Sequence, residues 1–529
     1  MPRTSRGFRF RPRLVVSLLS LLLLSFGTGE AERPRDLWFY YSADLSRDDA
    51  LTQLEPVWRR AAAAGYTKVM LVDSKLARLS EQNASYFATL ELVKSLAHTL
   101  GLEIVPGVFW IGRSHPLLAR SPDLAEGLPV RGTRFVVRGG IAHLSADPPV
   151  ALGTRPSRIE PAVLVTGRSA TISKHGGTAR FGFRVPVSPW RCYHVAVRVR
   201  TRDYTGEPSI RVIGSRRRLD WSRIRVKNDQ DWKVVHAVFN SLGNRTIEVQ
   251  FGDWYPGEGK LEWRDWAIEE VGPLNLLRRA DTPFTIEGRR EGRDFEAVRD
   301  TLLGMRPWRG QYDSWHTPPA IRTALPDGTV LRASWYHAAV INEEQVTACL
   351  SEPRTLHLLR DEARSVRNAL GTRGFAMLHD EIRALGWDPA CVARKTTPGA
   401  ILAEHVRQCA RLLRGAELYV WGDMFDPHQN AVRDDYLVNG SLAGSWTGLP
   451  SEVTILNWNA EDMRTSLRFF AARGHKQVIC GYYDGPPNGI RWLVRDARGI
   501  RGVTGVMYTT WRNDYSQLEA FAHAARDEK

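Results

Sequence analysis

The chain has 529 residues, 43% of them hydrophobic and 25% charged, which is typical of a globular protein with about two or three domains. Its formal net charge is +15, but the arginines are scattered and form no basic block, which argues against a nucleic-acid partner. The five cysteines show no CxxC spacing, which argues against a zinc site.

Residues 1–31 have the pattern of a secretory signal peptide. A basic segment over 1–13 is followed by an apolar run over 14–26 and by small residues around Gly29 and Ala31. The apolar run is shorter than the roughly 20 residues of a membrane span. We therefore expect a secreted or periplasmic protein with no membrane contact after cleavage. Export would allow one or two disulfides, with Cys349 and Cys391 as a candidate pair.

Residues 36–115 alternate between strand and helix patterns. Apolar strands are predicted over 37–42, 68–74 and 102–110, and the amphipathic helices between them end at Gly65 and Gly101. This order is typical of a parallel α/β architecture, so the segment is predicted to form the first part of a barrel.

Between residues 130 and 272 the pattern changes to short alternating strands separated by turn residues, which predicts an inserted antiparallel β-sandwich. The order of its last strands resembles the jelly-roll carbohydrate-binding modules that are attached to many secreted glycosidases. Residues 273–329 are interpreted as a connecting region.

Residues 330–529 return to the α/β pattern and are predicted to form the second part of the barrel. A strand over 330–338 is assigned to the long excursion after strand three, and a helix over 353–370 follows it. Five more strands are predicted, over 374–381, 416–426, 453–459, 476–485 and 502–514. With the three strands before the insertion they make eight. We therefore predict an α/β fold, a (β/α)8 TIM barrel with a jelly-roll-like sandwich inserted after strand three.

The strand ends, where a TIM barrel places its active site, carry aromatic and polar residues. Carboxyl groups in an aromatic-lined pocket suit glycosidic cleavage, which needs a protonated acid and a negative charge beside an oxocarbenium-like transition state. We predict Glu381 as the general acid, with Asp380 beside it in a second catalytic role. The predicted substrate-binding residues are His379, Trp421, Asp423, Trp458, Tyr483, Asp484 and Trp511.

An Asp-Glu pair at strand four, a Tyr-Asp pair at strand seven and a Trp at strand eight resemble glycoside hydrolase family 20, the β-N-acetylhexosaminidases. The resemblance implies that Glu381 is the acid and that Asp380 orients the substrate's acetamido group, which acts as the nucleophile. It also implies that Tyr483 contacts the acetamido oxygen and that the three tryptophans line the sugar pocket. The family's pair of glycines before Asp-Glu is absent here.

Two other functions stay open. The first is a retaining glycosidase resembling the large clan A, with Glu381 as acid and Asp484 as nucleophile. The second is a non-catalytic glycan-binding protein. In every case the expected partner is a carbohydrate, and neither an organic cofactor nor a metal is expected. The histidines His337, His379 and His428, taken with Asp423 and Asp426, match no established ligand spacing.

Overall fold

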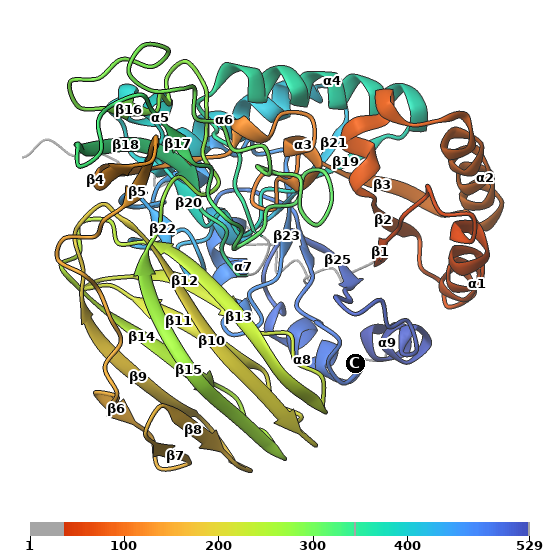
Figure 1. The fold of residues 1–529 in the computed structure, drawn as a ribbon. Helices are drawn as coiled ribbons and strands as arrows, with labels where there is room; N and C mark the ends of the chain where they lie inside the picture. The colour runs from red at the N-terminus through yellow and green to blue at the C-terminus, as the bar shows by residue number, and fades with distance from the viewer. Residues whose placement is uncertain (1–35, 343–344, 527–529) are drawn as a thin grey trace, which may run out of the picture.

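The computed structural model describes residues 36–342 and 345–526 and shows a closed barrel, a β-sandwich and a smaller third sheet (Figure 1). The predicted signal peptide lies outside the described residues. The barrel strands are all parallel, and β1 pairs with β25 to close the barrel. In order around the barrel they are β1 (Asp36–Ser42), β2 (Lys68–Val72), β3 (Glu103–Val108), β19 (Gly374–Met377), β21 (Glu417–Trp421), β23 (Thr454–Asn457), β24 (Gln477–Ile479) and β25 (Val503–Tyr508). Three strands before the insertion and five after it confirm the predicted eight-stranded barrel.

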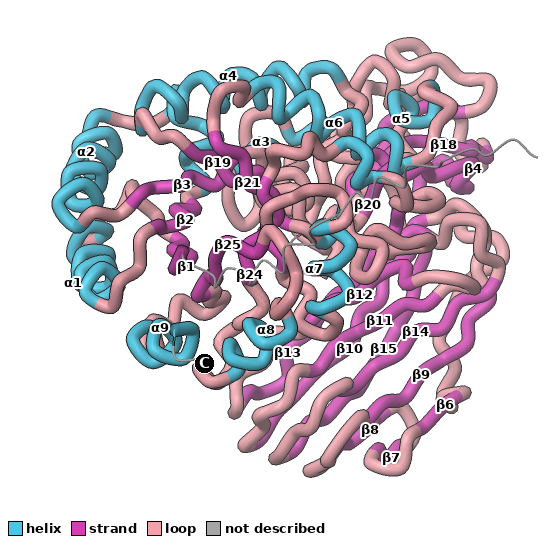
Figure 2. Tube along the Cα trace, turned by 180° about the vertical axis from the view of Figure 1, so that it is seen from behind, coloured by secondary structure: helices cyan, strands magenta, loops and turns pink. Residues whose placement is uncertain are grey.

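Helices surround the barrel on its outer side (Figure 2). The longer ones are α1 (Ala50–Ala63), α2 (Ala84–Leu100), α4 (Pro353–Leu370), α6 (Pro398–Leu412), α7 (Met463–Ala471), α8 (Gly489–Asp496) and α9 (Leu518–Arg526). The short ones are α3 (His115–Leu118) and α5 (Pro389–Ala393), with 3₁₀ turns η1 (Ser74–Glu81), η2 (Pro122–Leu124), η3 (Asp423–Phe425) and η4 (Ser445–Gly448). Within the described part of the chain, no helix is both long and apolar enough to cross a membrane.

Both faces of each barrel strand are buried, which explains why these strands read as continuous apolar runs. In β1 the side chain of Trp38 belongs to the cluster inside the barrel, together with Met70 and Met507. Its neighbour Phe39 points the other way and packs edge-on against Trp58 of α1, with ring centroids 6.2 Å apart. The interior is therefore a packed core, and a ligand can enter only at the ends of the strands.

The sandwich consists of two five-stranded antiparallel sheets. One has the order β13 (Gln230–Asn240), β10 (Cys192–Arg202), β15 (Lys260–Glu270), β8 (Ser169–Ile172) and β7 (Val163–Thr166). The other has the order β12 (Arg218–Arg223), β11 (Pro208–Ile213), β14 (Thr246–Asp253), β9 (Ala179–Pro186) and β6 (Arg158–Ile159). Their shared core also contains Ala384 and Leu437 from barrel loops, so the sandwich packs directly on the barrel.

A third sheet differs from the predicted domain boundaries. Its order is β16 (Thr285–Ile286), β18 (Val330–Ala338), β4 (Gly127–Arg138), β5 (Ile141–Leu144) and β17 (Ile321–Arg322). The strand predicted over 330–338 is present but pairs with β4, so it belongs neither to the barrel nor to a connecting loop. Likewise, residues 130–144 belong to this sheet and not to the sandwich. The pairing joins segments about 200 residues apart, which local alternation of residue types cannot reveal. The two-stranded pair β20 (Ala384–Leu385) and β22 (Leu437–Val438) completes the strands.

Candidate active site

A cavity of about 600 Å³ lies at the carboxyl ends of the barrel strands. Five of the predicted residues line it: Asp380, Glu381, Trp421, Trp458 and Trp511. A hollow of about 730 Å³ elsewhere, on the sandwich, is larger but contains neither carboxyl pair nor tryptophan. The cavity at the barrel mouth is therefore the better candidate for chemistry.

The aromatic wall of this cavity centres on Trp511, whose side chain is 51% exposed. Its ring lies edge-on to Tyr40 and to Trp421, with centroid distances of 5.2 and 6.3 Å, and stacks on Tyr483 at 6.2 Å. The hydroxyl of Tyr483 donates a hydrogen bond to the carbonyl of Trp458. Tyr483 therefore contacts two tryptophans of the wall, Trp458 and Trp511. It is not among the residues that line the cavity.

Asp380 is the carboxyl group whose surroundings favour the protonated form. Burial, and after it the nearby carboxylates of Asp423 and Glu381, raise its pKa from 3.8 to about 7. Burial and the proximity of Asp380 also raise the pKa of Tyr40 on the adjacent wall. The backbone around Asp380 is tightly enclosed, since a Cβ added to Gly112 would lie 1.8 Å from the Asp380 carbonyl oxygen. A side chain larger than hydrogen at position 112 would displace the acid.

Glu381 has the opposite environment. Its Oε2 accepts hydrogen bonds from Arg113 Nη2 at 3.0 Å and from the Gln345 side chain, and its Oε1 accepts one from Arg383 Nη2 at 2.9 Å. Burial alone would raise the pKa of Glu381, but the charges of Arg383 and Arg113 hold it below the ordinary value. Glu381 is therefore an anion at neutral pH, and the pKa values of the two adjacent carboxyl groups are shifted in opposite directions.

The backbone of Glu381 is in the left-handed region, with φ 48°, which costs a non-glycine residue about 1–2 kcal/mol. The structure fixes this conformation through Asp423, whose Oδ2 accepts the Glu381 backbone N–H at 2.9 Å and the Asn430 side-chain amide at 2.9 Å. Burial raises the pKa of Asp423 to about 6. Asp423 does not line the cavity, and in this structure it positions Glu381.

Two other predicted residues also lie outside the cavity lining. His379 is fully buried behind the strand, where its Nε2 lies 3.3 Å from Nδ1 of His405 in α6. Asp484 accepts the backbone N–H of Trp511 at 2.9 Å and so fixes the turn that presents this tryptophan. Successive side chains of an extended chain point to opposite faces, so His379 points away from the cavity when Asp380, the next residue, points into it.

Two buried clusters have the chemistry of metal ligands, and both lie outside the cavity lining. One comprises His379, His405 and Cys409, and the other Glu126, Cys349 and Cys391. The Sγ atoms of Cys349 and Cys391, the pair expected from the sequence, lie 3.8 Å apart. They are in contact as free thiols, so no disulfide joins them.

The residues expected from the sequence did not include several residues of the cavity: Arg113, Asn342, Trp221 and Arg223. Arg113 lies in the loop after the third barrel strand, and residues of such loops are expected at the active site, so its position in the sequence could have predicted its place in the cavity. Trp221 and Arg223 come from β12 of the sandwich, and no local pattern indicates that this strand reaches the barrel mouth. Four buried polar atoms of the lining have no hydrogen-bond partner among the described residues: Nε1 of Trp110, Nε1 of Trp221, Nε1 of Trp458 and Oδ1 of Asn342. Such atoms are available to a polar ligand.

No protein-family model matches the chain, and no curated protein resembles it in sequence. Among solved structures, a chitobiase from Flavobacterium johnsoniae is similar over 93% of this chain and 48% of its own, with 12% identity and a TM-score of 0.40. A carbohydrate-binding module of Cellvibrio mixtus lichenase 5A, in complex with cellotriose, is similar over 23% of this chain and 97% of its own, with 11% identity and a TM-score of 0.18. A CBM4 structure is similar over 22% of this chain and 79% of its own, with 10% identity and a TM-score of 0.18. The fold follows from the strand topology of the chain itself, and its site must be interpreted from its own residues.

Proposed function

We propose that this chain is a glycoside hydrolase that acts on β-linked glycans. The observation that carries the proposal is the adjacent pair at the mouth of a tryptophan-lined cavity, in which Asp380 stays protonated near neutral pH while Glu381 stays ionised. Two carboxyl groups whose environments separate their pKa values are the basis of acid-assisted glycosidic cleavage.

In this proposal Asp380 donates its proton to the glycosidic oxygen as the bond to the anomeric carbon breaks, and the leaving sugar departs as an alcohol. Water then adds to the anomeric carbon and gives a proton to the Asp380 carboxylate, which restores the acid. The negative charge of Glu381 stabilises the positive charge that develops on the sugar ring. The tryptophan faces hold the ring and exclude water, which keeps the pKa of Asp380 high. This assignment differs from the expectation from the sequence, in which Glu381 is the acid. Arg113 and Arg383 form ion pairs with Glu381 and stabilise its ionised form, so Glu381 carries no proton to donate.

A non-catalytic glycan-binding protein is the second candidate, and one observation favours it. Both oxygens of Glu381 are engaged, by Arg113 and Gln345 on one side and by Arg383 on the other. A nucleophile or base needs a free lone pair directed at the substrate. The clan A alternative has less support, because Asp484 is not part of the cavity lining.

The test is hydrolysis of a panel of aryl β-glycosides, including the N-acetylglucosaminide and the glucuronide, by the wild type and by Asp380→Asn and Glu381→Gln. Asp361→Asn, on the exposed face of α4, is the matched control. General-acid catalysis contributes about 10²–10⁴-fold, so Asp380→Asn should lose at least a hundredfold in kcat while Asp361→Asn keeps full activity. The rate should fall above pH 7 as Asp380 loses its proton.

Cleavage of the acetamido sugar alone would support participation of the substrate's acetamido group, as the family 20 resemblance implies. A larger loss in Glu381→Gln than in Asp380→Asn, without the fall above pH 7, would return the acid role to Glu381. If no glycoside is cleaved and all variants bind sugars equally, the glycan-binding function replaces the enzymatic one.

A further inference from the structure

The edge strand of the sandwich is part of the barrel cavity. Trp221 and Arg223 of β12 line it together with Asp380 and Glu381. The sheet continues away from the cavity through β11, β14 and β9, so its outer face is a surface that begins at the catalytic pair. A chain of sugars leaving the cavity on this side would lie across these strands.

The strand register places eight residues of this outer face in two rows that cross the sheet. From β12 to β9 the rows read Arg223, Ser209, Gly252, Arg180 and Trp221, Arg211, Gln250, Gly182. The two glycines leave part of the face without side chains. Neighbouring strands are about 4.8 Å apart, so the four strands extend over roughly 15 Å. This length suits several sugar rings beyond the one in the cavity.

Arginines and aromatic rings alternate along this face. The Arg211 guanidinium lies 3.8 Å from the ring centre of Trp254 and 5.1 Å from that of Trp221. The Arg223 guanidinium also lies 5.1 Å from the ring centre of Trp221, and the Arg180 guanidinium lies 5.5 Å from the ring centre of Trp254. Stacking of this kind holds a guanidinium by its flat face and leaves its N–H edge available for hydrogen bonds.

Arg211 is the central group of the series. Its Nε is buried and has no hydrogen-bond partner within the described part of the chain. Burial, and after it the charge of Arg218, lower the pKa of Arg211 to about 10, so it remains cationic at neutral pH. A buried cationic donor without an acceptor is a polar group that a ligand anion would satisfy.

The same series connects to the catalytic pair. The ring of Tyr436 stacks on Trp221 at 6.4 Å and lies 4.5 Å from the Arg383 guanidinium, which is the ion-pair partner of Glu381. Few acids offset the positive charge of the face. Glu160 forms an ion pair with Arg180 at 2.5 Å, and Glu248 accepts a hydrogen bond from the side-chain amide of Gln250.

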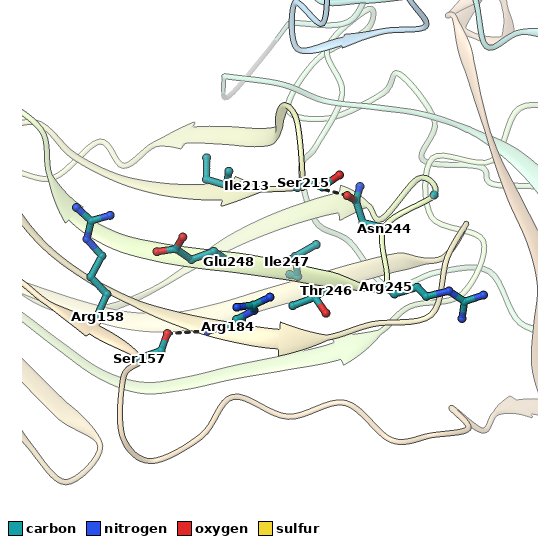
Figure 3. A pocket seen from close by; sticks show the side chains of 12 residues that line it. Ser157, Arg158, Arg184, Ile213, Ser215, Asn244, Arg245, Thr246, Ile247 and Glu248 are labelled. Carbon is teal, nitrogen blue, oxygen red and sulfur yellow. Dashed lines mark hydrogen bonds between the residues drawn. The ribbon is translucent and has the colours of Figure 1, made fainter.

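The far end of the same sheet is also basic. The hollow of about 730 Å³ lies there, and Figure 3 shows Arg158, Arg184 and Arg245 around it with the single acid Glu248. Arg180, Gly182 and Arg184 occupy alternate positions of β9, so Arg184 lies on the same face of the sheet as Arg180. Positive charge therefore continues from the barrel mouth to the distant edge of the sandwich.

We infer that the substrate of the proposed hydrolase is a polyanionic glycan, whose reacting sugar occupies the barrel cavity and whose neighbouring sugars lie across β12, β11, β14 and β9. The inference rests on the proposed function for the cleavage step only. The arginines bind the acidic groups of the glycan through paired N–H donors, and Trp221 and Trp254 stack on sugar faces. A neutral glycan accepts hydrogen bonds through its hydroxyl oxygens but brings no negative charge to Arg211 and Arg223.

The test is binding in 0.15 M salt, measured by titration calorimetry with the wild-type chain and four polymers. Hyaluronan is β-linked and carries carboxylates, chondroitin sulfate is β-linked and carries sulfates as well, laminarin is a neutral β-linked glycan, and polyglutamate is an anion without sugars. The variant is Arg211→Ala/Arg223→Ala. Its matched control is Arg360→Ala/Arg364→Ala, which removes two exposed arginines from α4. Arg223→Ala alone, at an exposed position, covers the case in which loss of Arg211 prevents folding.

The inference predicts micromolar binding of at least one acidic glycan, an affinity at least tenfold weaker in the Arg211→Ala/Arg223→Ala variant, and no change in the α4 control. Comparison of the affinities for hyaluronan and for chondroitin sulfate identifies carboxylate or sulfate as the group that is recognised. Laminarin binding that neither variant alters would overturn the inference while leaving the hydrolase proposal intact. If polyglutamate binds as tightly as the acidic glycans, and both Arg211→Ala/Arg223→Ala and Arg360→Ala/Arg364→Ala weaken its binding to the same extent, the binding is a non-specific charge effect. That result would also overturn the inference. Selective binding of an acidic glycan by a chain that cleaves no sugar would support the inference and refute the enzymatic function.

Discussion

Replacing Asp380 with asparagine should change how the stability of the protein depends on pH. The folded protein holds the Asp380 proton up to a pKa of about 7, whereas the unfolded chain releases it near 3.8. Between these values the folded state binds more protons than the unfolded state, so the wild type loses stability as pH rises through this window. Asparagine has no proton to lose and avoids this loss.

The size of the effect follows from the two pKa values. Each tenfold difference in proton affinity corresponds to about 1.4 kcal/mol, so a pKa of about 7 instead of 3.8 corresponds to roughly 4 kcal/mol. Solvent reaches the carboxyl through the cavity, which reduces the difference. We therefore expect the stability of Asp380→Asn relative to wild type to rise by about 2–4 kcal/mol between pH 4 and pH 8.

Urea unfolding followed by tryptophan fluorescence measures this quantity at a series of pH values. The readout is the difference in unfolding midpoint between variant and wild type, with Asp361→Asn as the control for an amide substitution on the surface. A difference that stays constant from pH 4 to pH 8 would show that Asp380 ionises at an ordinary pKa. In that case Asp380 has no proton to donate at neutral pH, and the proposed acid is refuted.

Three further substitutions test the same site. Removing the charge of Glu381 with glutamine should destabilise the fold by about 3 kcal/mol, because its partner Arg383 has a side chain only 10% exposed, although that of Arg113 is 45% exposed. Denaturant titration measures this loss, and a much smaller loss would show that the ion pair with Arg383 is dispensable. Arg113→Ala should raise the pKa of both Glu381 and Asp380, so both limbs of the rate–pH profile should move to higher pH; an unmoved profile would exclude these groups as the titrating pair. Gly112→Ala should lower kcat without removing sugar binding, since the added Cβ displaces the Asp380 backbone, and an unchanged kcat would contradict the required close approach.

Much of the architecture can be predicted from local sequence. Continuous apolar runs and amphipathic helices give the barrel strands and their order, because each strand is buried on both faces and each helix on one. The turn-rich alternating segment likewise predicts antiparallel sheet. The third sheet could not be predicted, because β4 and β18 are paired by tertiary contacts across the whole insertion.

Local sequence patterns are enough to predict that two carboxyl groups and several tryptophans meet at the barrel mouth, since strand ends in a closed parallel barrel converge on one face. The tertiary structure alone decided which carboxyl keeps its proton. Arg113 comes from the loop after β3 and Arg383 from the chain after β19, and together they keep Glu381 ionised. At Asp380 the charge of Arg113 lowers the pKa less than burial and the carboxylates of Asp423 and Glu381 raise it. The tertiary structure also decided that the sandwich contributes Trp221 to the cavity. Protonation depends on desolvation and on charges a few ångströms away, and those distances are set by packing between segments that are remote in the sequence.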